Sequence, residues 1–302
     1  MHKYLIVLTG PTGIGKTSLG IKLAKHFSTE IVSSDSRQIF KELKIGTAVP
    51  KDEELEIVRH HFIQTHSINE NYNASRYETE ALEIINTLFK KHNIVLLVGG
   101  SMLYIDAVCN GIDIMPDADP EIRKSLKDKF EKEGIESLRF QLKKLDPDYY
   151  NTVDLKNPNR LIHALEISIM TGKPYSTFRS NPKKPRPFSV IKIGLNCDRK
   201  ILHHQINDRV DQMTAEGLES EARNLYPLKH LNSLNTVGYR ELFEYFDGTI
   251  TKEKAIELIK RNSRRYARKQ LTWFRNDPEM NWYEPTQTNE IITFIEKSIN
   301  EK

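Results

Sequence analysis

Short runs of apolar residues alternate with stretches of helical periodicity along much of the chain. The apolar runs, each bounded by polar or turn-forming residues, are Tyr4–Leu8, Glu30–Ser34, Ile94–Val98 and Val190–Leu195. Runs of this length without polar alternation are typical of strands that are buried on both faces. Because helical patterns lie between the first three runs, the chain is predicted to form an α/β fold with a doubly wound parallel sheet.

The pattern changes between Met115 and Pro187, where strand-like runs are absent and leucines recur at helical spacing. This segment ends in the proline-rich basic stretch PKKPRPF. We therefore expect an all-helical domain at residues 113–188, inserted into a core domain formed by residues 1–112 and 189–302. After Cys197, the core domain is expected to be helical as far as about Phe274.

The composition is that of a globular chain. Hydrophobic residues make up 38% of the 302 residues and charged residues 28%. No run approaches the roughly 20 apolar residues that span a bilayer, and the apolar stretch near the N-terminus is too short for a secretory signal. The two cysteines, Cys109 and Cys197, exclude a disulfide framework and fit a reducing compartment. We expect the protein to be cytoplasmic.

Positive charge is concentrated in one segment. The net charge of the chain is only +4, yet Lys252–Arg275 contains nine basic and two acidic residues. On a helical wheel, one arc carries the basic residues Arg261, Arg264, Arg265, Arg268, Lys269 and Arg275. The other arc carries Ile256, Ile259, Tyr266, Ala267, Leu271, Trp273 and Phe274. Such a stripe is typical of a helix that binds a polyanion, although a solvated helix face gives the same pattern.

A phosphate-binding motif follows the first apolar run. Residues 10–17 read GPTGIGKT, a complete G-x-x-x-x-G-K-T motif of P-loop type. In this motif, backbone N–H groups and a helix N-terminus bind phosphate, the lysine adds a cation, and the final hydroxyl suits a Mg²⁺ ligand. The residues expected to bind a diphosphate or nucleotide are Gly10, Pro11, Thr12, Gly13, Ile14, Gly15, Lys16 and Thr17, with Thr17 as the metal ligand.

Polar residues also follow the next two apolar runs, with SDSRQ at residues 34–38 and GGS at residues 99–101. The carboxyl ends of parallel strands lie at one edge of a sheet, so these residues are expected near the phosphate loop. Asp35 is either a catalytic carboxylate or a helix N-cap, and its position alone does not decide between them. No carboxylate follows Ile94–Val98, where nucleotide hydrolases and kinases usually carry a Mg²⁺-binding aspartate.

Six motifs, in order, make the chain resemble the tRNA dimethylallyltransferase family, also called tRNA isopentenyltransferases. They are GPTGIGKTSL, SSDSRQIFKELKIGTAVP, LLVGGSMLYIDAV, NRLIHALEISIMTGKP, VGYRELFEYFDG and RRYARKQLTWFR. The resemblance extends from about Lys3 to Trp282. It implies transfer of the dimethylallyl group from dimethylallyl diphosphate to N6 of adenosine 37, in tRNAs that read codons beginning with U. The products would be N6-dimethylallyladenosine and diphosphate.

The resemblance also implies roles for individual residues. Asp35 would act as the general base that accepts the adenine N6 proton as the new C–N bond forms. Lys16 and Mg²⁺ would stabilise the departing diphosphate. Ser101 stands where the family usually has threonine and keeps the hydroxyl, and Arg209 matches an arginine near the diphosphate.

Further positions are expected to contact tRNA. They are Asp35, Ser36, Arg37, Gln38, Ser101, Arg123, Arg160, Arg240, Arg264, Arg265, Arg268, Lys269 and Arg275. Among them, Gln38 is expected to recognise adenine through its side-chain amide. His163 stands where the family often has a further arginine.

Two other classes share parts of this pattern. A P-loop kinase of small molecules also has a parallel sheet with a helical lid, whereas an RNA-binding GTPase-like module would need a guanine motif that is not visible here. The histidine pairs at 60–61 and 203–204 do not favour a metal site, because adjacent residues do not share a helix face. We expect a monomer that binds tRNA and dimethylallyl diphosphate, with no membrane partner.

Overall fold

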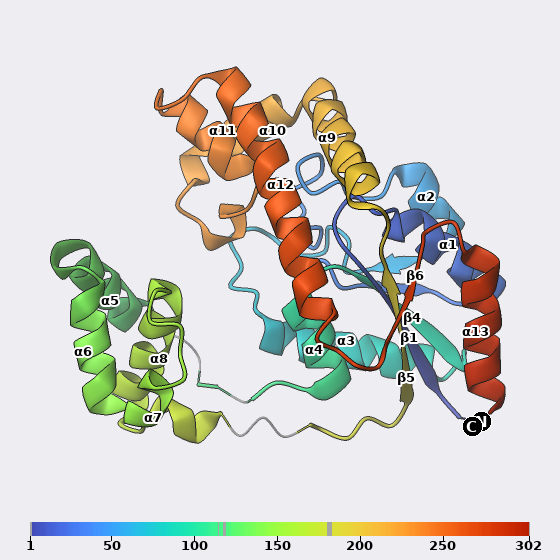
Figure 1. Cartoon of the computed structure of the whole chain (residues 1–302), viewed down its shortest axis with the longest axis horizontal. Coiled ribbons are helices and arrows are strands. Elements are labelled where there is room, and N and C mark those ends of the chain that lie inside the picture. The colour runs from blue at the N-terminus through green and yellow to red at the C-terminus, as the bar shows by residue number, and fades with distance from the viewer. Residues whose placement is uncertain (1, 114, 117–118, 180–182, 302) are drawn as a thin grey trace. The chain divides into compact units, whose positions relative to one another are not determined.

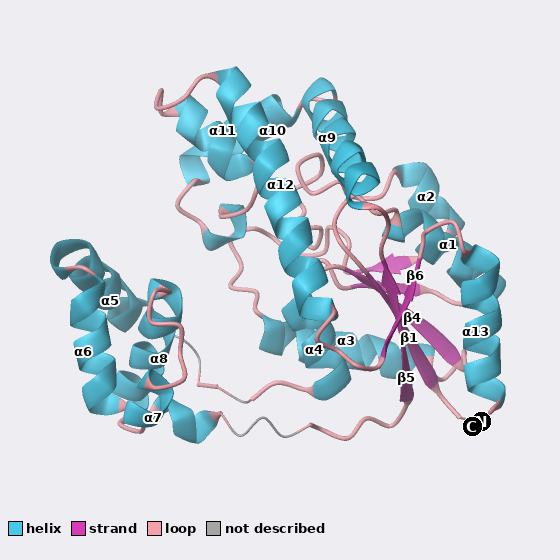
Figure 2. Cartoon of the chain, in the orientation of Figure 1, coloured by secondary structure: helices cyan, strands magenta, loops and turns pink. Residues whose placement is uncertain are grey.

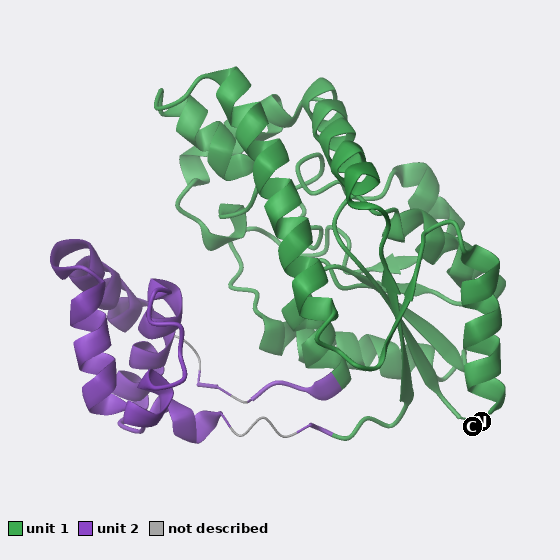
Figure 3. Ribbon diagram, in the orientation of Figure 1, with its two compact units in different colours: residues 1–109, 185–302 green, residues 110–184 purple. Residues whose placement is uncertain are grey.

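The computed structural model describes residues 2–113, 115–116, 119–179 and 183–301 and divides the chain into two units. The first unit, residues 1–109 and 185–302, contains the sheet, and the second, residues 110–184, is helical (Figure 3). Among the described residues, the first unit contains two hydrophobic cores and the second contains one.

Six strands form one sheet in the order β3-β2-β4-β1-β5-β6, and every neighbouring pair is parallel (Figure 2). The strands are β1 (Tyr4–Thr9), β2 (Ile31–Ser33), β3 (His60–His61), β4 (Ile94–Gly99), β5 (Ser189–Leu195) and β6 (Met280–Tyr283). The predicted parallel α/β fold with a helical insertion is confirmed. The apolar pattern predicts four of these strands but not β3 or β6, which are short edge strands.

Both faces of the sheet are buried. Along β1, Leu5 and Val7 belong to one hydrophobic core, whereas Ile6 and Leu8 belong to the other. Successive side chains of a strand point to opposite faces, so a strand between two cores is apolar at every position. This is why β1 and β4 appear in the sequence as unbroken apolar runs.

The helices of the first unit lie around the sheet (Figure 1), and all except the short helix at residues 52–57 contribute buried residues to the two cores. They are α1 (Lys16–His26), α2 (Asp52–Ile57), α3 (Ala74–Leu88), α4 (Met102–Asn110), α9 (Arg199–Ala215), α10 (Leu218–Leu225), α11 (Tyr239–Phe246), α12 (Lys252–Phe274) and α13 (Thr288–Asn300). α3 and α4 pack into the core that contains Leu5, and α1 and α13 pack into the core that contains Ile6. The stretch after Cys197 is therefore helical as expected, but 3₁₀ turns at Tyr226–Leu228 and Asn232–Leu234 interrupt it.

The basic helix α12 departs from the predicted division into two arcs. Its buried residues are Ala255, Ile259, Ala267, Gln270 and Phe274. Tyr266 and Trp273, expected on the apolar arc, are 36% and 39% exposed, and the polar Gln270 is 2% exposed. The expectation that Tyr266 and Trp273 lie in the core is therefore wrong, because a hydrogen-bonded polar side chain occupies part of the buried face.

The second unit contains α5 (Pro120–Glu133), α6 (Ile135–Leu145), α7 (Pro147–Tyr150), α8 (Pro158–Thr171) and a 3₁₀ turn at Tyr175–Phe178. Three of the helices begin with proline directly after an N-cap residue, which is Asp119, Asp146 or Asn157. Proline at the first helical position lacks only an N–H that would be unpaired there, and the cap side chain accepts from the next free N–H groups.

The fully buried Asp146 connects α7 to the 3₁₀ turn. Its carboxylate accepts hydrogen bonds from the Tyr149 backbone N–H at 3.0 Å, the Ser176 backbone N–H at 2.6 Å and the Ser176 hydroxyl at 2.8 Å. We expect Asp146→Ala to lower the free energy of unfolding by about 2–4 kcal/mol, because buried donors lose their acceptor. Urea unfolding with hydrogen–deuterium exchange of α7 measures this loss. The exposed Asp148→Ala is the control, and equal stability of the two variants would contradict this interpretation.

Candidate active site

The phosphate loop connects β1 to α1 and needs glycine at two points. Gly10 has a φ of +150°, and a Cβ there would lie 2.8 Å from the Leu195 carbonyl oxygen on β5. Gly15, the N-cap of α1, has a φ of +93° and provides no side-chain cap for the helix. The first N–H groups of α1 therefore lack a side-chain acceptor, an arrangement that suits an anion.

Two cations stand beside this loop. The Lys16 ammonium donates to the carbonyl oxygens of Gly10 at 3.0 Å and Pro11 at 2.9 Å. Burial, and next the charge of Arg209 on α9, lower the pKa of Lys16 to about 7, although Asp35 opposes both effects. The pKa of Arg209 is also lowered by burial, with Asp35 again opposing the shift. Both cations would be stabilised by an anion bound between them.

A cavity of about 460 Å³ contains the loop and both cations. Its lining includes Thr12, Gly13, Gly15, Lys16, Thr17, Asp35, Gln38, Gly99, Gly100, Arg209, Tyr266 and Gln270. The structure thus brings most of the predicted phosphate-binding residues together with Asp35 and Arg209. We call this space the phosphate cavity.

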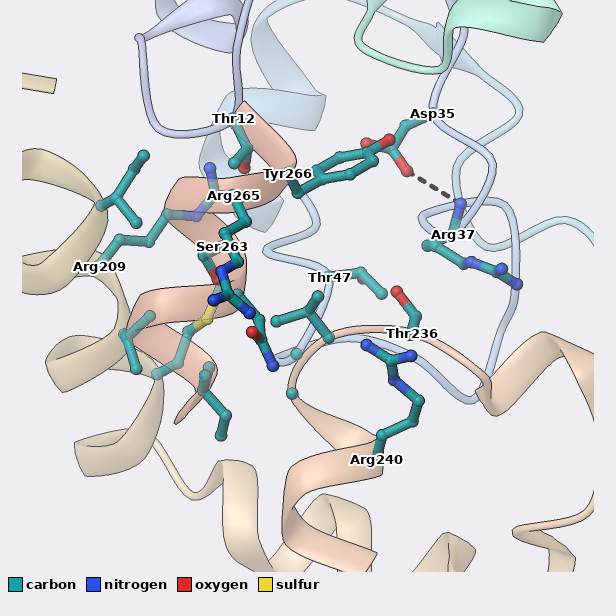
Figure 4. Close-up of a pocket in the computed structure, with 18 of the residues that line it drawn as sticks. Thr12, Asp35, Arg37, Thr47, Arg209, Thr236, Arg240, Ser263, Arg265 and Tyr266 are labelled. Atoms are coloured by element: carbon teal, nitrogen blue, oxygen red, sulfur yellow. Dashed lines mark hydrogen bonds between the residues drawn. The ribbon is translucent and has the colours of Figure 1, made fainter. Parts of the chain in front are cut away.

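Asp35 follows β2 and precedes a turn at residues 36–39 rather than a helix, so the expected helix N-cap is not formed. Its Oδ1 accepts from the backbone N–H groups of Arg37 at 2.9 Å and Gln38 at 3.2 Å, as a capping aspartate does. The side chain nevertheless lines the phosphate cavity and a second cavity beside it. Figure 4 shows the ring of Tyr266 extending toward the Asp35 carboxylate. One oxygen thus holds the carboxylate in place, while Oδ2 remains for a ligand.

Ser101 joins the loop after β4 to the loop after β2. Its hydroxyl accepts from the Ser36 backbone N–H at 2.8 Å and donates to the Ser36 hydroxyl at 3.0 Å. Its carbonyl oxygen accepts from Tyr104 and Ile105 in the first turn of α4. Ser101 therefore fixes the cavity wall next to Asp35.

The side chains of Arg37 and Gln38 are bonded to backbone carbonyl groups. Arg37 donates to the Ser233 carbonyl oxygen at 3.0 Å, and Gln38 donates to those of Thr47 at 3.1 Å and Ala48 at 2.8 Å. Both residues shape the cavity wall in this structure. Recognition of adenine by Gln38 stays a prediction.

The second cavity, of about 640 Å³, meets the phosphate cavity at shared residues that include Asp35, Arg209 and Tyr266. Eight of the predicted tRNA contacts line it. They are Asp35, Ser36, Arg37 and Ser101, together with Arg240 on α11 and Arg265, Arg268 and Lys269 on α12. Arg264 instead donates to Asn207 on α9, and Arg275 is exposed at the end of α12. Figure 4 shows Arg240 and Arg265 near Thr47 and Thr236. We call this space the basic cavity.

Tyr266 is one of the two residues of α12 that the helical pattern places in the core and the structure does not. It lines the phosphate cavity, the basic cavity and a third cavity of about 560 Å³. Burial, with the negative charge of Asp35 as the next cause, raises the pKa of Tyr266 to about 12, so the phenol stays protonated near neutral pH. An aromatic residue next to Arg265 within a basic helix is a signal that could have indicated nucleic-acid contact.

Arg123 and Arg160, the predicted tRNA contacts of the helical unit, lie in different surroundings. The Nε atom of Arg123 lies 3.3 Å from Oε2 of the fully buried Glu166, and Nδ1 of His163 lies 3.8 Å from the same atom. Burial, and secondarily Arg123, lowers the pKa of His163. The Arg160 side chain is exposed in the first turn of α8. Arg123 is therefore held by an ion pair, whereas Arg160 is accessible to solvent.

The described part of the chain has neither a cluster of metal-ligating side chains nor a membrane-spanning helix. No group of three or more histidine, cysteine, aspartate or glutamate side chains there could hold a metal ion. The ring of His60 bonds to the Val58 carbonyl oxygen, and that of His61 to Glu30. Among the described residues, no helix is both long enough and apolar enough to cross a membrane.

Residues 38–277 match the family model described as IPP transferase. The chain is 54% identical over 297 residues to "tRNA dimethylallyltransferase 1" of Bacteroides fragilis, covering 98% of this chain and 99% of the relative. It is 53% identical over 301 residues to "tRNA dimethylallyltransferase" of Christiangramia forsetii, covering 99% of this chain and 100% of the relative.

Two solved structures are similar over nearly the whole chain. One is the tRNA isopentenylpyrophosphate transferase of Bacillus halodurans, with a TM-score of 0.73, 35% identity, and coverage of 99% of this chain and 97% of that one. The other is a eukaryotic dimethylallyltransferase acting on tRNA, with a TM-score of 0.81, 25% identity, and coverage of 99% of this chain and 80% of that one.

The geometry of the phosphate cavity predicts a strong role for Lys16 in anion binding. Lys16→Ala should weaken the binding of inorganic pyrophosphate by about 2–4 kcal/mol, or about 30- to 1,000-fold in Kd, because a buried cation is removed. Isothermal titration calorimetry in the presence of Mg²⁺ measures the change. Lys25→Ala, an exposed position on the same helix, is the control. Equal affinities of the two variants would contradict the assignment.

Proposed function

Because this chain belongs to the IPP transferase family, we propose that it transfers the dimethylallyl group of dimethylallyl diphosphate to N6 of adenosine 37 in tRNA. The enzyme is thus a prenyltransferase rather than a small-molecule kinase or a GTPase-like module. We extend the proposal to tRNAs that read codons beginning with U. The observation that carries it is the junction of the phosphate cavity with the basic cavity, where Asp35, Arg209 and Tyr266 line both.

The phosphate cavity suits the leaving group of this reaction. As the allylic C–O bond breaks, negative charge grows on the diphosphate oxygens while the dimethylallyl group gains positive charge. Lys16 and Arg209 are in place to stabilise the oxygens before the reaction begins, which is how preorganised charges lower a barrier. The loop thus stabilises a departing diphosphate rather than a transferred phosphoryl group.

The donor set at this cavity fits a Mg²⁺ ion that is bound mainly through its ligand. The protein offers the Thr17 hydroxyl, and no group of metal-ligating side chains is present among the described residues. Mg²⁺ commonly keeps several waters and binds through phosphate oxygens. When bound, the ion would neutralise part of the diphosphate charge.

Asp35 is positioned to accept the proton that the adenine amine loses. The N6 lone pair is delocalised into the ring, and a carboxylate cannot deprotonate the amine before reaction. As the C–N bond forms, however, N6 becomes acidic, and Oδ2 of Asp35 can accept its proton. The backbone N–H groups of Arg37 and Gln38 hold Oδ1 and so fix the direction of the carboxylate.

The target adenine must leave the anticodon-loop stack to reach Asp35. Extrusion of a base costs a few kcal/mol, which contacts to the phosphate backbone can offset. We assign these contacts to Arg265, Arg268 and Lys269, which have no acidic partner among the described residues. The ring of Tyr266 would pack against the extruded base at the junction of the cavities.

The remaining expectations are part of the same proposal. We also propose that the protein acts as a monomer. A tRNA substrate also favours the cytoplasm as the place of action. Arg123 and Arg160 of the helical unit are proposed as further tRNA contacts.

Asp35→Asn tests the general base with little change in structure. The amide oxygen can still accept from Arg37 and Gln38, but an amide cannot take the N6 proton. We expect kcat to fall by about 10²–10⁴, with the tRNA affinity nearly unchanged. Single-turnover transfer of labelled dimethylallyl diphosphate to unmodified tRNA measures this change. Wild-type turnover by the variant would exclude the base role, and failure of the wild-type enzyme to transfer would exclude the function.

The basic face of α12 predicts a salt dependence. With about six phosphates contacted, tRNA affinity should fall by about 10³ between 50 and 200 mM salt. Replacing Arg265, Arg268 and Lys269 by glutamine should reduce the slope of log K, where K is the association constant for tRNA, against log salt by about 2.7. The same replacement should weaken the binding of all tRNAs to a similar extent.

The matched control for this experiment removes three charges from the same helix. Lys252, Lys254 and Lys260 are paired with Glu219, Glu257 and Asp211, and replacing these lysines by glutamine should change the slope less. Filter binding at several salt concentrations distinguishes the two triple variants. Equal slopes for both would show that α12 has only a general electrostatic effect.

A further inference from the structure

Gln270 is a polar residue on the buried face of the basic helix. It is 2% exposed, and both ends of its amide are bonded to loops of the phosphate cavity. Oε1 accepts from the Thr12 backbone N–H at 2.9 Å, and Nε2 donates to the Gly100 carbonyl oxygen at 2.8 Å. One side chain therefore connects α12 to the loop after β1 and to the loop after β4.

The contact at Gly100 is tight. A Cβ on Gly100 would lie 2.4 Å from Nε2 of Gln270 and 3.5 Å from the Lys16 ammonium. The Gln270 amide thus holds both loops directly beside Lys16. A small displacement of α12 along its axis would have to move these loops or break two buried hydrogen bonds, which is costly.

The outward side of the same helical turn carries Arg268 and Lys269, which line the basic cavity. Successive helix residues are about 100° apart, so residues 268–269 and 270 can face different surroundings. α12 is continuous from Lys252 to Phe274, so a force on its basic face reaches Gln270 through a rigid element.

We propose that Gln270 is a positioning residue that couples tRNA binding on α12 to diphosphate binding in the phosphate cavity. This inference rests on the proposed function. RNA phosphates bound to Arg268 and Lys269 favour the position of α12 in which Gln270 bonds to both loops. In this position of α12, the phosphate loop after β1 is oriented to bind the diphosphate. Because coupling between two ligands is reciprocal, bound diphosphate strengthens tRNA binding by the same factor.

Calorimetric titration of the full chain with inorganic pyrophosphate and Mg²⁺, with and without saturating unmodified anticodon stem-loop RNA, measures this coupling. In the wild-type protein, RNA should lower the pyrophosphate Kd by about fivefold or more. In Gln270→Met, which keeps the length of the side chain but removes both hydrogen bonds, the ratio of the two Kd values should fall to within about twofold of one.

A second variant breaks the same contact from the other side. Gly100→Ala places a methyl group against Nε2 of Gln270 and should also abolish the coupling. Thr272→Val, on the exposed side of α12, is the matched control and should keep the wild-type ratio. Thermal unfolding establishes which variants fold.

If the role of Gln270 were purely structural, its replacement would change the stability and would change the pyrophosphate Kd by the same factor with and without RNA. The ratio of the two Kd values would then keep its wild-type value. Retention of the wild-type ratio in either folded variant therefore overturns the proposal, as does a ratio of one in the wild-type protein. The wild-type transfer assay separates this outcome from failure of the proposed function. If the wild-type enzyme transfers the dimethylallyl group but its ratio of Kd values is one, only the coupling is overturned. If the wild-type enzyme does not transfer the group, the proposed function is overturned.

Discussion

The site depends on two neighbouring cations, Lys16 and Arg209, held in a cavity that contains Asp35. Burial disfavours the charged form of each side chain and therefore lowers both pKa values. One carboxylate cannot neutralise two cations and also remain available as a base. In the proposed reaction, a diphosphate supplies the missing negative charge. The two cations would then be preorganised to stabilise a leaving group.

The fold supplies this arrangement through loops at one edge of a parallel sheet. β1, β2 and β4 are adjacent, so the loops after them meet although they are far apart in the sequence. Hydrogen bonds of Ser101 to Ser36 and of Gln270 to Thr12 and Gly100 then fix the loops against one another. Cavity walls are thus held by side chains that need not touch a substrate.

Sequence patterns predict the structural features that depend on residues close together in the chain. They do not predict features that depend on residues far apart in the chain. The phosphate loop and β1 are evident because a buried six-residue strand and a complete motif lie next to each other. β3 is only two residues long and exists through its pairing with β2, so its own sequence gives no signal. A helical wheel assumes one buried face and therefore predicts Tyr266 in the core, whereas tertiary contacts bury Gln270 and expose Tyr266 to the cavities. The Ser36–Ser101 bond joins residues 65 positions apart and needed the structure.

In the reaction that we propose, a phosphate loop stabilises a departing diphosphate while carbon is transferred to RNA. An assay that supplies unmodified tRNA together with carbon-labelled dimethylallyl diphosphate and ATP labelled in its γ-phosphate tests this reaction. We expect the carbon label on an adenosine of the tRNA, released diphosphate, and no phosphate label in any product. Transfer of the γ-phosphate without incorporation of carbon would contradict it.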